Sequence, residues 1–467
     1  MDRRTFLERS FKASAGAAIG AHLPFAMQAH ADLPTLLNRN LLAHFMLLGG
    51  PDFRHIFPPA FDPTPNSFGR EFFRIRATAY GIDATPEAGE AYWNANFTPV
   101  TSNGVNFGMM NGLEWLKTMW DAGNVALVTN VVGAVSRDHA HAQLVWESSD
   151  RTVLQTFRPD TGWGGRLADA ADGRLFSTTP APRLFCLHQH PDDANLVGTQ
   201  RIVTLTDPNN VGLFEPDISV PDDDIQRGIS RALANYYSVK DATVPAGSPH
   251  RVFVDHQQNL TELKDLLRPR FDTFTEPAAL TSLYAGAMPL ANLPIAFQFR
   301  SLYYALSAGD LMDIAAVSMA YGSFDSHDNQ QEEIEGKFVD FFGNGGAMDT
   351  LYQLLPATVA DQIVFVFSGE FGRQLKANGG FGTDHGTGNT VLVIGMPVNG
   401  GVYGEMFPEE ELDRLDQPTP DIDGRTDVDA LFAELAEWVV PGSSPSVFPG
   451  LQNARIEQGV NLAGLFV

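Results

Sequence analysis

Short, almost wholly apolar segments alternate with longer amphipathic segments along most of this chain. The apolar segments have the length of buried strands, and they predict strands at residues 43–48, 125–132, 183–187, 314–320, 362–367 and 391–394. The amphipathic segments predict helices at residues 107–121, 139–148, 163–171, 330–354 and 427–438. This alternation is typical of an α/β fold in which a mostly parallel sheet is sandwiched by helices.

A different pattern occupies residues 222–300, where helical periodicity continues with little strand signal. Two helices with acidic caps are predicted there, at 222–240 and 252–268, and we interpret them as part of a helical insertion at about 222–300. No segment has the composition of a linker between domains. We therefore predict that residues 32–467 form a single α/β domain with helical insertions.

The composition narrows the classes of protein to which this chain can belong. Its 467 residues include 56 acidic and 31 basic side chains, which gives a formal net charge of −25. Nucleic-acid binding needs a basic face, so this balance argues against a nucleic-acid partner. The hydrophobic share of 44% is typical of a packed globular protein. Cys186 is the single cysteine, so the chain can build neither an intramolecular disulfide nor a thiolate metal cluster.

The N-terminal residues resemble a twin-arginine export signal. Arg3-Arg4 is followed by Phe6-Leu7, by a weakly apolar stretch over residues 13–25 and by the small-x-small site Ala29-His30-Ala31. The alternative is an ordinary amphipathic first helix. We expect residues 1–31 to be a signal peptide and the mature protein to be periplasmic or secreted. No run of about 18 apolar residues occurs elsewhere, so we expect no membrane span in the mature protein.

Acidic and histidine residues follow several of the predicted strands. Three strands lead into Gly50-Pro51-Asp52, Asp325-Ser326-His327 and Ser368-Gly369-Glu370, and a glycine-rich loop before the last strand contains Asp384-His385. The carboxyl ends of parallel strands meet at one edge of a sheet, so these side chains are expected to lie at that edge. Carboxylates and imidazoles without thiolates suit zinc, manganese, iron, magnesium or calcium. Each pair taken alone also fits a turn or a helix cap.

The segment Ser136–His141 contains a further pair of histidines. His139 and His141 lie two positions apart at the start of a predicted helix, where they point to different sides. At most one of them can therefore face a site. Asp138 equally fits a helix N-terminus whose dipole favours an acid, and both interpretations remain open.

In order along the chain, these segments resemble the domain-of-unknown-function-1501 family, exported bacterial proteins placed in the alkaline phosphatase/sulfatase-like superfamily. The landmarks are Gly49-Gly50-Pro51, Leu127–Asn130 with Asp138-His139, Thr161–Arg166, Phe324–His327, Ser368–Arg373 and Thr383–Gly386. Among these segments, Glu370-Phe371-Gly372-Arg373 and Asp384-His385-Gly386 indicate the family most specifically.

The resemblance implies an alkaline-phosphatase-like fold with its site at the carboxyl edge of the sheet. By resemblance, hydrolases of this superfamily use two divalent metals. Asp52 matches their first acid, Asp325 and His327 the middle pair, and His385 the late histidine, with Asp384 beside it. No Ser or Thr follows Asp52 directly, so a conventional covalent nucleophile is not visible.

Two functional hypotheses follow. The first is a metal-dependent hydrolase of small anionic phosphate or sulfate esters. Its divalent metal would be zinc, manganese, calcium or magnesium, with Asp52, Asp325, His327, Glu370, Asp384 and His385 as ligands or their partners. The candidate catalytic residues are His139 and Arg373, and Arg373 would hold the anionic group by bidentate hydrogen bonds unless it pairs with Glu370 on the surface. The second hypothesis is a non-catalytic periplasmic binding or assembly protein on a degenerate hydrolase fold.

Overall fold

The structure is a computed structural model, and it describes most of the chain. The described residues are 33–154, 159–190, 193–198, 201–208, 223–245, 248–285, 294–449 and 460–467. The predicted signal peptide at 1–31 lies outside them.

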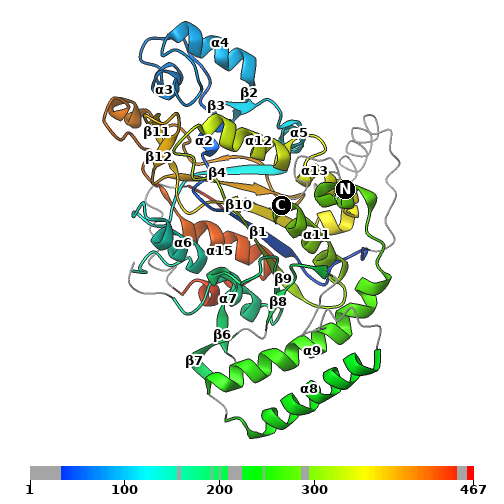
Figure 1. The fold of residues 1–467 in the computed structure, drawn as a ribbon. Coiled ribbons are helices and arrows are strands. Elements are labelled where there is room, and N and C mark those ends of the chain that lie inside the picture. The colour runs from blue at the N-terminus through cyan, green and yellow to red at the C-terminus, as the bar shows by residue number, and fades with distance from the viewer. Residues whose placement is uncertain are drawn as a thin grey trace, which may run out of the picture.

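A nine-stranded sheet occupies the centre of the described part of the chain (Figure 1). Its strands, in spatial order, are β14 (Gly401–Tyr403), β4 (Val125–Val132), β13 (Asn389–Ile394), β10 (Ile363–Ser368), β1 (Leu41–Leu47), β9 (Ile314–Tyr321), β5 (Arg174–Ser177) and β8 (Ile202–Thr204), with β15 (Thr426–Asp427) paired to β4. Only β13 runs antiparallel to its neighbours among these strands. The predicted α/β fold with a mostly parallel sheet is therefore confirmed.

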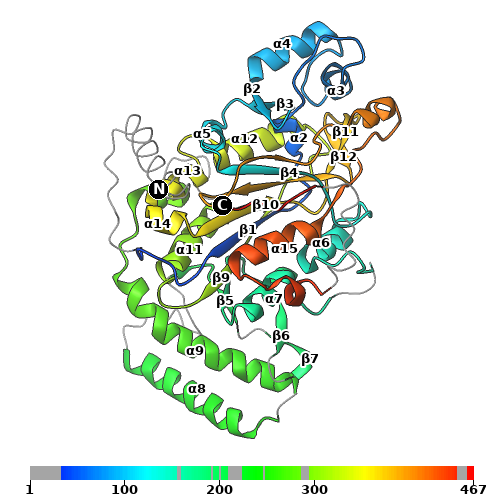
Figure 2. The ribbon, with the colours of Figure 1, turned by 180° about the vertical axis from the view of Figure 1, so that it is seen from behind.

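Both faces of the sheet are buried, which explains why its central strands are almost continuously apolar. Successive side chains of β1 point to opposite faces: Phe45 joins one hydrophobic core, and Met46 joins the other. The first core is completed by α5 (Glu114–Asp121), α11 (Pro294–Ser307), α12 (Gln330–Phe342) and α13 (Ala347–Leu354). The second is completed by α7 (Trp163–Ala170) and α15 (Val428–Val439), which Figure 2 shows from behind.

Two of the predicted elements are wrong. The helix expected at 107–121 begins only at Glu114, because Val105–Met110 form strand β3, which pairs with β2 (Phe97–Ser102). The strand expected at 183–187 is a turn of 3₁₀ helix at Leu184–Cys186. Its backbone lies so close to the glycines of α7 that a Cβ on Gly162 would stand 2.0 Å from the Leu184 carbonyl oxygen. The other predicted strands agree with the structure to within two residues at each end.

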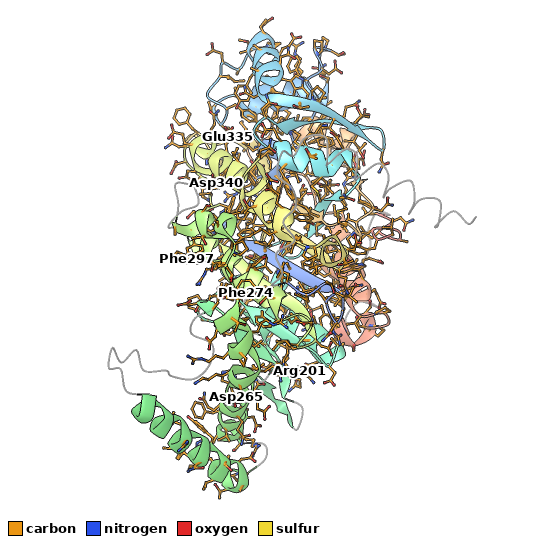
Figure 3. All side chains as sticks on the ribbon, turned by 90° about the vertical axis from the view of Figure 1, so that its right-hand side faces the viewer. Arg201, Asp265, Phe274, Phe297, Glu335 and Asp340 are labelled. Atoms are coloured by element: carbon orange, nitrogen blue, oxygen red, sulfur yellow. The ribbon has the colours of Figure 1, made fainter. Side chains whose placement is uncertain are left out.

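The predicted helices at 222–240 and 252–268 are present as α8 (Asp223–Thr243) and α9 (Pro249–Thr273), followed by α10 (Ala278–Ala285). The pair α8 and α9 projects away from the sheet (Figures 1 and 3). Within the described residues, we find no helix with the length and apolar character needed to cross a bilayer.

The carboxyl ends of β1, β9 and β10 meet at one edge of the sheet, since Leu47 pairs with Tyr321 and Met46 pairs with Ser368. Two further elements reach the same edge. Helix α6 (His139–Ser148) follows β4, and the hairpin of β11 (Arg373–Ala377) and β12 (Thr383–His385) follows β10. Loops from four separate parts of the sequence therefore converge there.

Candidate metal centre

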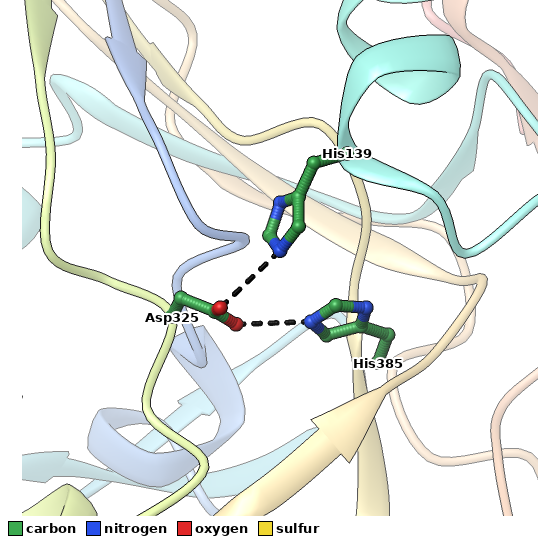
Figure 4. A group of neighbouring side chains, drawn as sticks. All are labelled: His139, Asp325 and His385. Atoms are coloured by element: carbon green, nitrogen blue, oxygen red, sulfur yellow. Dashed lines mark hydrogen bonds and ion pairs between the residues drawn. The ribbon is translucent and has the colours of Figure 1, made fainter.

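Four side chains gather at this edge of the sheet: His139, Asp325, His327 and His385, which we call the edge cluster. Asp325 and His327 lie in the loop after β9, His385 ends β12, and His139 begins α6. Figure 4 shows His139 and His385 pointing at the Asp325 carboxylate from two sides.

The Nε2 atom of each cluster histidine lies within hydrogen-bonding distance of the Asp325 carboxylate. Asp325 Oδ1 is 2.9 Å from His385 Nε2 and 3.1 Å from His327 Nε2, whereas Asp325 Oδ2 is 3.3 Å from His139 Nε2. The Nε2 atoms of His327 and His385 are 2.9 Å apart. His139, Asp325 and His385 form a group that could hold a metal ion, with one ligand atom from each residue within 4.8 Å of the others.

Each histidine of the cluster uses its other ring nitrogen, Nδ1, to contact a hydrogen-bond acceptor. The acceptors are the Glu370 carboxylate for His139 at 2.8 Å, the Asp384 carboxylate for His327 at 3.0 Å and the Arg137 carbonyl for His385 at 2.8 Å. A carbonyl or an ionised carboxylate can only accept, so each Nδ1 carries the proton. In a neutral imidazole the Nε2 atom then has a free lone pair, and all three lone pairs face Asp325.

Three lone pairs directed at one carboxylate repel it unless a proton or a cation lies between them. Metal-binding histidines have this arrangement, in which the outer nitrogen donates to a carboxylate or carbonyl while the inner nitrogen binds the ion. The donor set of the edge cluster therefore fits a divalent metal. Its side chains are also open to solvent on one side, with 43% of the Asp325 side chain and 36% of the His139 side chain exposed.

Glu370 is buried beneath the cluster and orients His139. Its carboxylate accepts hydrogen bonds from the Gly49 and Gly50 amides and from Gln143. Burial alone would raise the pKa of Glu370, but the hydrogen bond from His139 and those from the backbone outweigh burial and lower it. The same Glu370 hydrogen bond raises the pKa of His139. Glu370 is therefore an ionised partner of a ligand.

Gly49 allows the close approach that brings these loops together. Its φ of +112° is in the range that favours glycine, and a Cβ at this position would stand 2.2 Å from the Asp325 amide nitrogen. Any side chain here would push the β9 loop, and with it Asp325, away from Glu370.

Arg373 lies in the interior of the protein and contacts Asp325 from the buried side of the edge cluster. Its Nη2 donates to Asp325 Oδ1 at 2.6 Å, and its other donors reach the carbonyls of Gly50 and Thr383, each at 2.8 Å. None of its side chain is exposed. The alternative of a surface pair between Arg373 and Glu370 is therefore wrong, because both side chains are buried. The geometry favours a positioning role for Arg373 over contact with a substrate.

The electrostatics of Asp325 follow from these contacts. Burial opposes ionisation, but the neighbouring His385 and Arg373 side chains outweigh it and hold the pKa of Asp325 well below its usual range. The pKa of His385 is lowered, chiefly by burial. A charged carboxylate beside a neutral imidazole is the protonation state that a metal site requires.

Asp52 lies elsewhere, in a closed network. It is 1% exposed, its carboxylate pairs with the buried Arg76, and Gln330 donates to it at 2.9 Å. Arg76 donates in addition to the carbonyls of Gln374 and Leu375. Burial opposes ionisation of Asp52, but the Arg76 charge keeps its pKa low. Among the described residues, Asp52 is not part of the group that could hold a metal.

Several residues that build the site carry no recognisable signal in the sequence. Asn378 donates to Asp384 at 3.0 Å, and the Arg137 carbonyl fixes His385. The helix start at Asp138 was a visible signal: its side chain caps α6 by accepting from the His141 amide at 2.9 Å. That cap directs His139 to the cluster, while His141 turns away to the Val153 carbonyl.

A protein-family model matches part of the chain. The family model described as "Protein of unknown function (DUF1501)" matches residues 267–417, which include Asp325, His327, Glu370, Asp384 and His385. This match supports the resemblance to that family over this stretch. No curated protein matches the chain significantly.

Proposed function

We propose that the edge cluster binds one divalent metal ion and that the protein is an exported, metal-dependent hydrolase of phosphate or sulfate esters. One observation carries the metal proposal. Three imidazoles, each with Nδ1 bound to an acceptor, direct Nε2 at a single ionised carboxylate. Family membership alone would not support an activity, because a fold hosts many functions.

The charge of the surrounding side chains supports a divalent ion. Asp325, Glu370 and Asp384 contribute three carboxylates, and Arg373 contributes one guanidinium. With neutral imidazoles, two negative charges remain unbalanced, and one divalent cation would neutralise them.

The donor set narrows the choice of metal. Imidazole nitrogens suit zinc and carboxylate oxygens suit manganese, so a set of three imidazoles and one carboxylate favours zinc first, whereas magnesium and calcium take oxygen ligands almost alone. His139, His327, His385 and Asp325 would hold the ion, with Glu370 and Asp384 orienting two of the imidazoles. When bound in an open site, such an ion lowers the pKa of a coordinated water and makes hydroxide available at neutral pH.

A second candidate function, a non-catalytic binding protein, is favoured by one observation. Arg373, the residue expected to hold an anionic ester, is buried and donates within the protein. The same holds for Thr383, whose hydroxyl lies two residues before His385: it is buried and donates to Gln330 at 2.6 Å, so it is not exposed as a nucleophile. Neither Arg373 nor Thr383 is therefore placed to contact a substrate.

Elemental analysis combined with an ester panel separates the two functions. We expect about one equivalent of zinc or manganese in the wild-type protein, and strong loss of it in His327→Ala and His385→Ala. The matched control is His250→Ala, since His250 is exposed on α9 and should leave the metal content unchanged. Hydrolysis of a phosphate or sulfate ester that falls with metal content supports an enzyme. Bound metal without turnover supports the binding protein, and metal-free protein contradicts the metal proposal.

Export by the twin-arginine route is a separate part of the proposal and rests on Arg3-Arg4, Phe6-Leu7 and the cleavage site at Ala29–Ala31. Changing Arg3 and Arg4 to Lys is expected to trap the protein in the cytoplasm. Fractionation of cells expressing both forms tests this, and an unchanged periplasmic yield would contradict it.

A further inference from the structure

The tip of the β11–β12 hairpin contains an aromatic residue in an unfavourable setting. The tip has the sequence Asn378-Gly379-Gly380-Phe381-Gly382, and Phe381 has φ +65°, a left-handed conformation that bulky residues rarely adopt. Its side chain is 54% exposed. Folding alone gives no reason for an aromatic side chain at a position that glycine would occupy without strain.

The surrounding structure imposes this conformation. The Gln330 amide donates to the Phe381 carbonyl at 3.1 Å, and the Asn329 amide donates to the Gly380 carbonyl at 2.9 Å. The Asn378 side chain accepts from the amides of Gly380 and Gly382. The tip is thus held by backbone contacts on both sides, and strained residues that are held in this way concentrate at functional sites.

The hairpin tip lies directly against the loop that carries His327. A Cβ on Gly382 would stand 2.4 Å from the His327 carbonyl carbon, and a Cβ on Gly380 would stand 1.9 Å from the Asp328 carboxylate. The chain then continues from Phe381 into Asp384 and His385. The backbone of Phe381 is therefore held next to the loop that carries His327, and its ring is exposed there.

We propose that Phe381 is a specificity-determining residue that contacts the apolar part of an ester bound at the edge cluster. The inference rests on the proposed metal site and names its substrate class: phosphate or sulfate esters with an aromatic or other extended apolar substituent. Stacking on such a group buries the exposed ring and gives an aromatic side chain a function at a position suited to glycine.

Binding of two phosphonates tests this contact. In a phosphonate a carbon–phosphorus bond replaces the ester bond, so an ester hydrolase cannot cleave the compound during the measurement. By titration calorimetry with the metal-loaded protein, we expect phenylphosphonate to bind Phe381→Asn about tenfold more weakly than wild type, a loss of about 1.4 kcal/mol. Methylphosphonate should bind both forms equally, and Phe381→Tyr should keep the wild-type affinity for phenylphosphonate within about twofold. The control is Phe297→Asn (Figure 3), because Phe297 is a comparably exposed phenylalanine, 42% exposed, on α11 and outside the edge cluster.

The thermal midpoint of Phe381→Asn gives a second readout. Asparagine tolerates positive φ, so the midpoint should stay level or rise. A fall of several degrees would show that the ring is structural and would overturn the proposal, as would equal weakening of both phosphonates or no weakening of either. If wild-type protein holds the metal but binds phenylphosphonate and methylphosphonate equally, the Phe381 contact fails while the metal site stands. If the purified protein takes up no metal and binds neither phosphonate, both the metal site and the Phe381 contact are contradicted.

Discussion

Asp325 and Asp52 occupy similar places in the sequence but opposite environments in the structure. Each follows a buried strand of the same sheet, β9 for Asp325 and β1 for Asp52. Asp325 is 43% exposed and faces three imidazoles as well as the buried guanidinium of Arg373, whereas Asp52 is 1% exposed and is enclosed with the guanidinium of Arg76. An arginine keeps its charge permanently, so Asp52 is already neutralised. Arg373 balances one charge at Asp325, but the carboxylates of Glu370 and Asp384 lie behind two of its imidazoles, so the edge cluster keeps a negative charge that a cation would balance.

The largest expected effect concerns stability at Asp52. The Asp52→Ala substitution leaves Arg76 charged and buried with two carbonyl partners, which is expected to cost about 3–5 kcal/mol of unfolding free energy. Asp325→Ala should cost less, about 1–3 kcal/mol, because Asp325 is partly exposed and the buried Arg373 that loses it keeps the carbonyls of Gly49, Gly50, Phe324 and Thr383. Urea unfolding in the presence of a chelator measures both. Equal losses would remove the distinction between the two aspartates.

An intermediate effect, on metal affinity, is expected when the carboxylates that orient the cluster histidines are changed. Glu370→Gln and Asp384→Asn each weaken the acceptor that orients an imidazole, and such changes typically lower metal affinity about 10- to 100-fold. Competition with a chromophoric chelator measures this affinity. Glu332→Gln is the control, since Glu332 is an exposed acid in the first turn of α12 and lies outside the edge cluster. Wild-type affinity in both partner variants would show that the Nδ1 contacts do not support metal binding.

At neutral pH the smallest expected effect lies outside both regions, at His44, and it grows only as the pH falls. His44 is buried against Trp163 and Phe185, and burial, with a smaller contribution from Arg183, lowers its pKa to about 3. The unfolded chain binds a proton near pH 6.5 and the folded chain does not, so stability is complete above that pH and falls as the pH drops toward 3. The slope from this group is at most about 1.4 kcal/mol per pH unit.

His44→Gln should therefore flatten the dependence of unfolding free energy on pH between 6.5 and about 4. Urea unfolding of both forms at several pH values measures the difference. Identical slopes would contradict this, because they would mean that His44 binds its proton equally in the folded and unfolded states over this pH range.

Much of the fold could be predicted from the sequence, because buried strands are recognisable by apolar length alone. β4 matches its prediction at both ends, and α8 and α9 lie where periodicity indicated them. The prediction failed at Val105–Met110, where apolar residues of a hairpin also satisfy helical spacing. It failed at Leu184–Cys186 because close packing against the α7 glycines, a tertiary contact, replaces a strand by a 3₁₀ turn.

The site was predictable only in part. Strand ends brought Asp325, His327 and His385 to one edge as expected, since β-sheet topology places them there. The sequence cannot separate a ligand from a partner of a ligand, so it leaves both roles open for Glu370 and Asp384. Nor could it show that Arg76, 24 residues after Asp52, would turn inward to neutralise that carboxylate.

The location of bound metal tests the central claim most directly. Crystals of protein loaded with zinc or manganese, measured on both sides of the metal absorption edge, would give an anomalous difference map. The account predicts one strong peak between the Nε2 atoms of His139, His327 and His385 and the Asp325 carboxylate, with none at Asp52. A peak at Asp52, or no peak at the edge cluster, would contradict it.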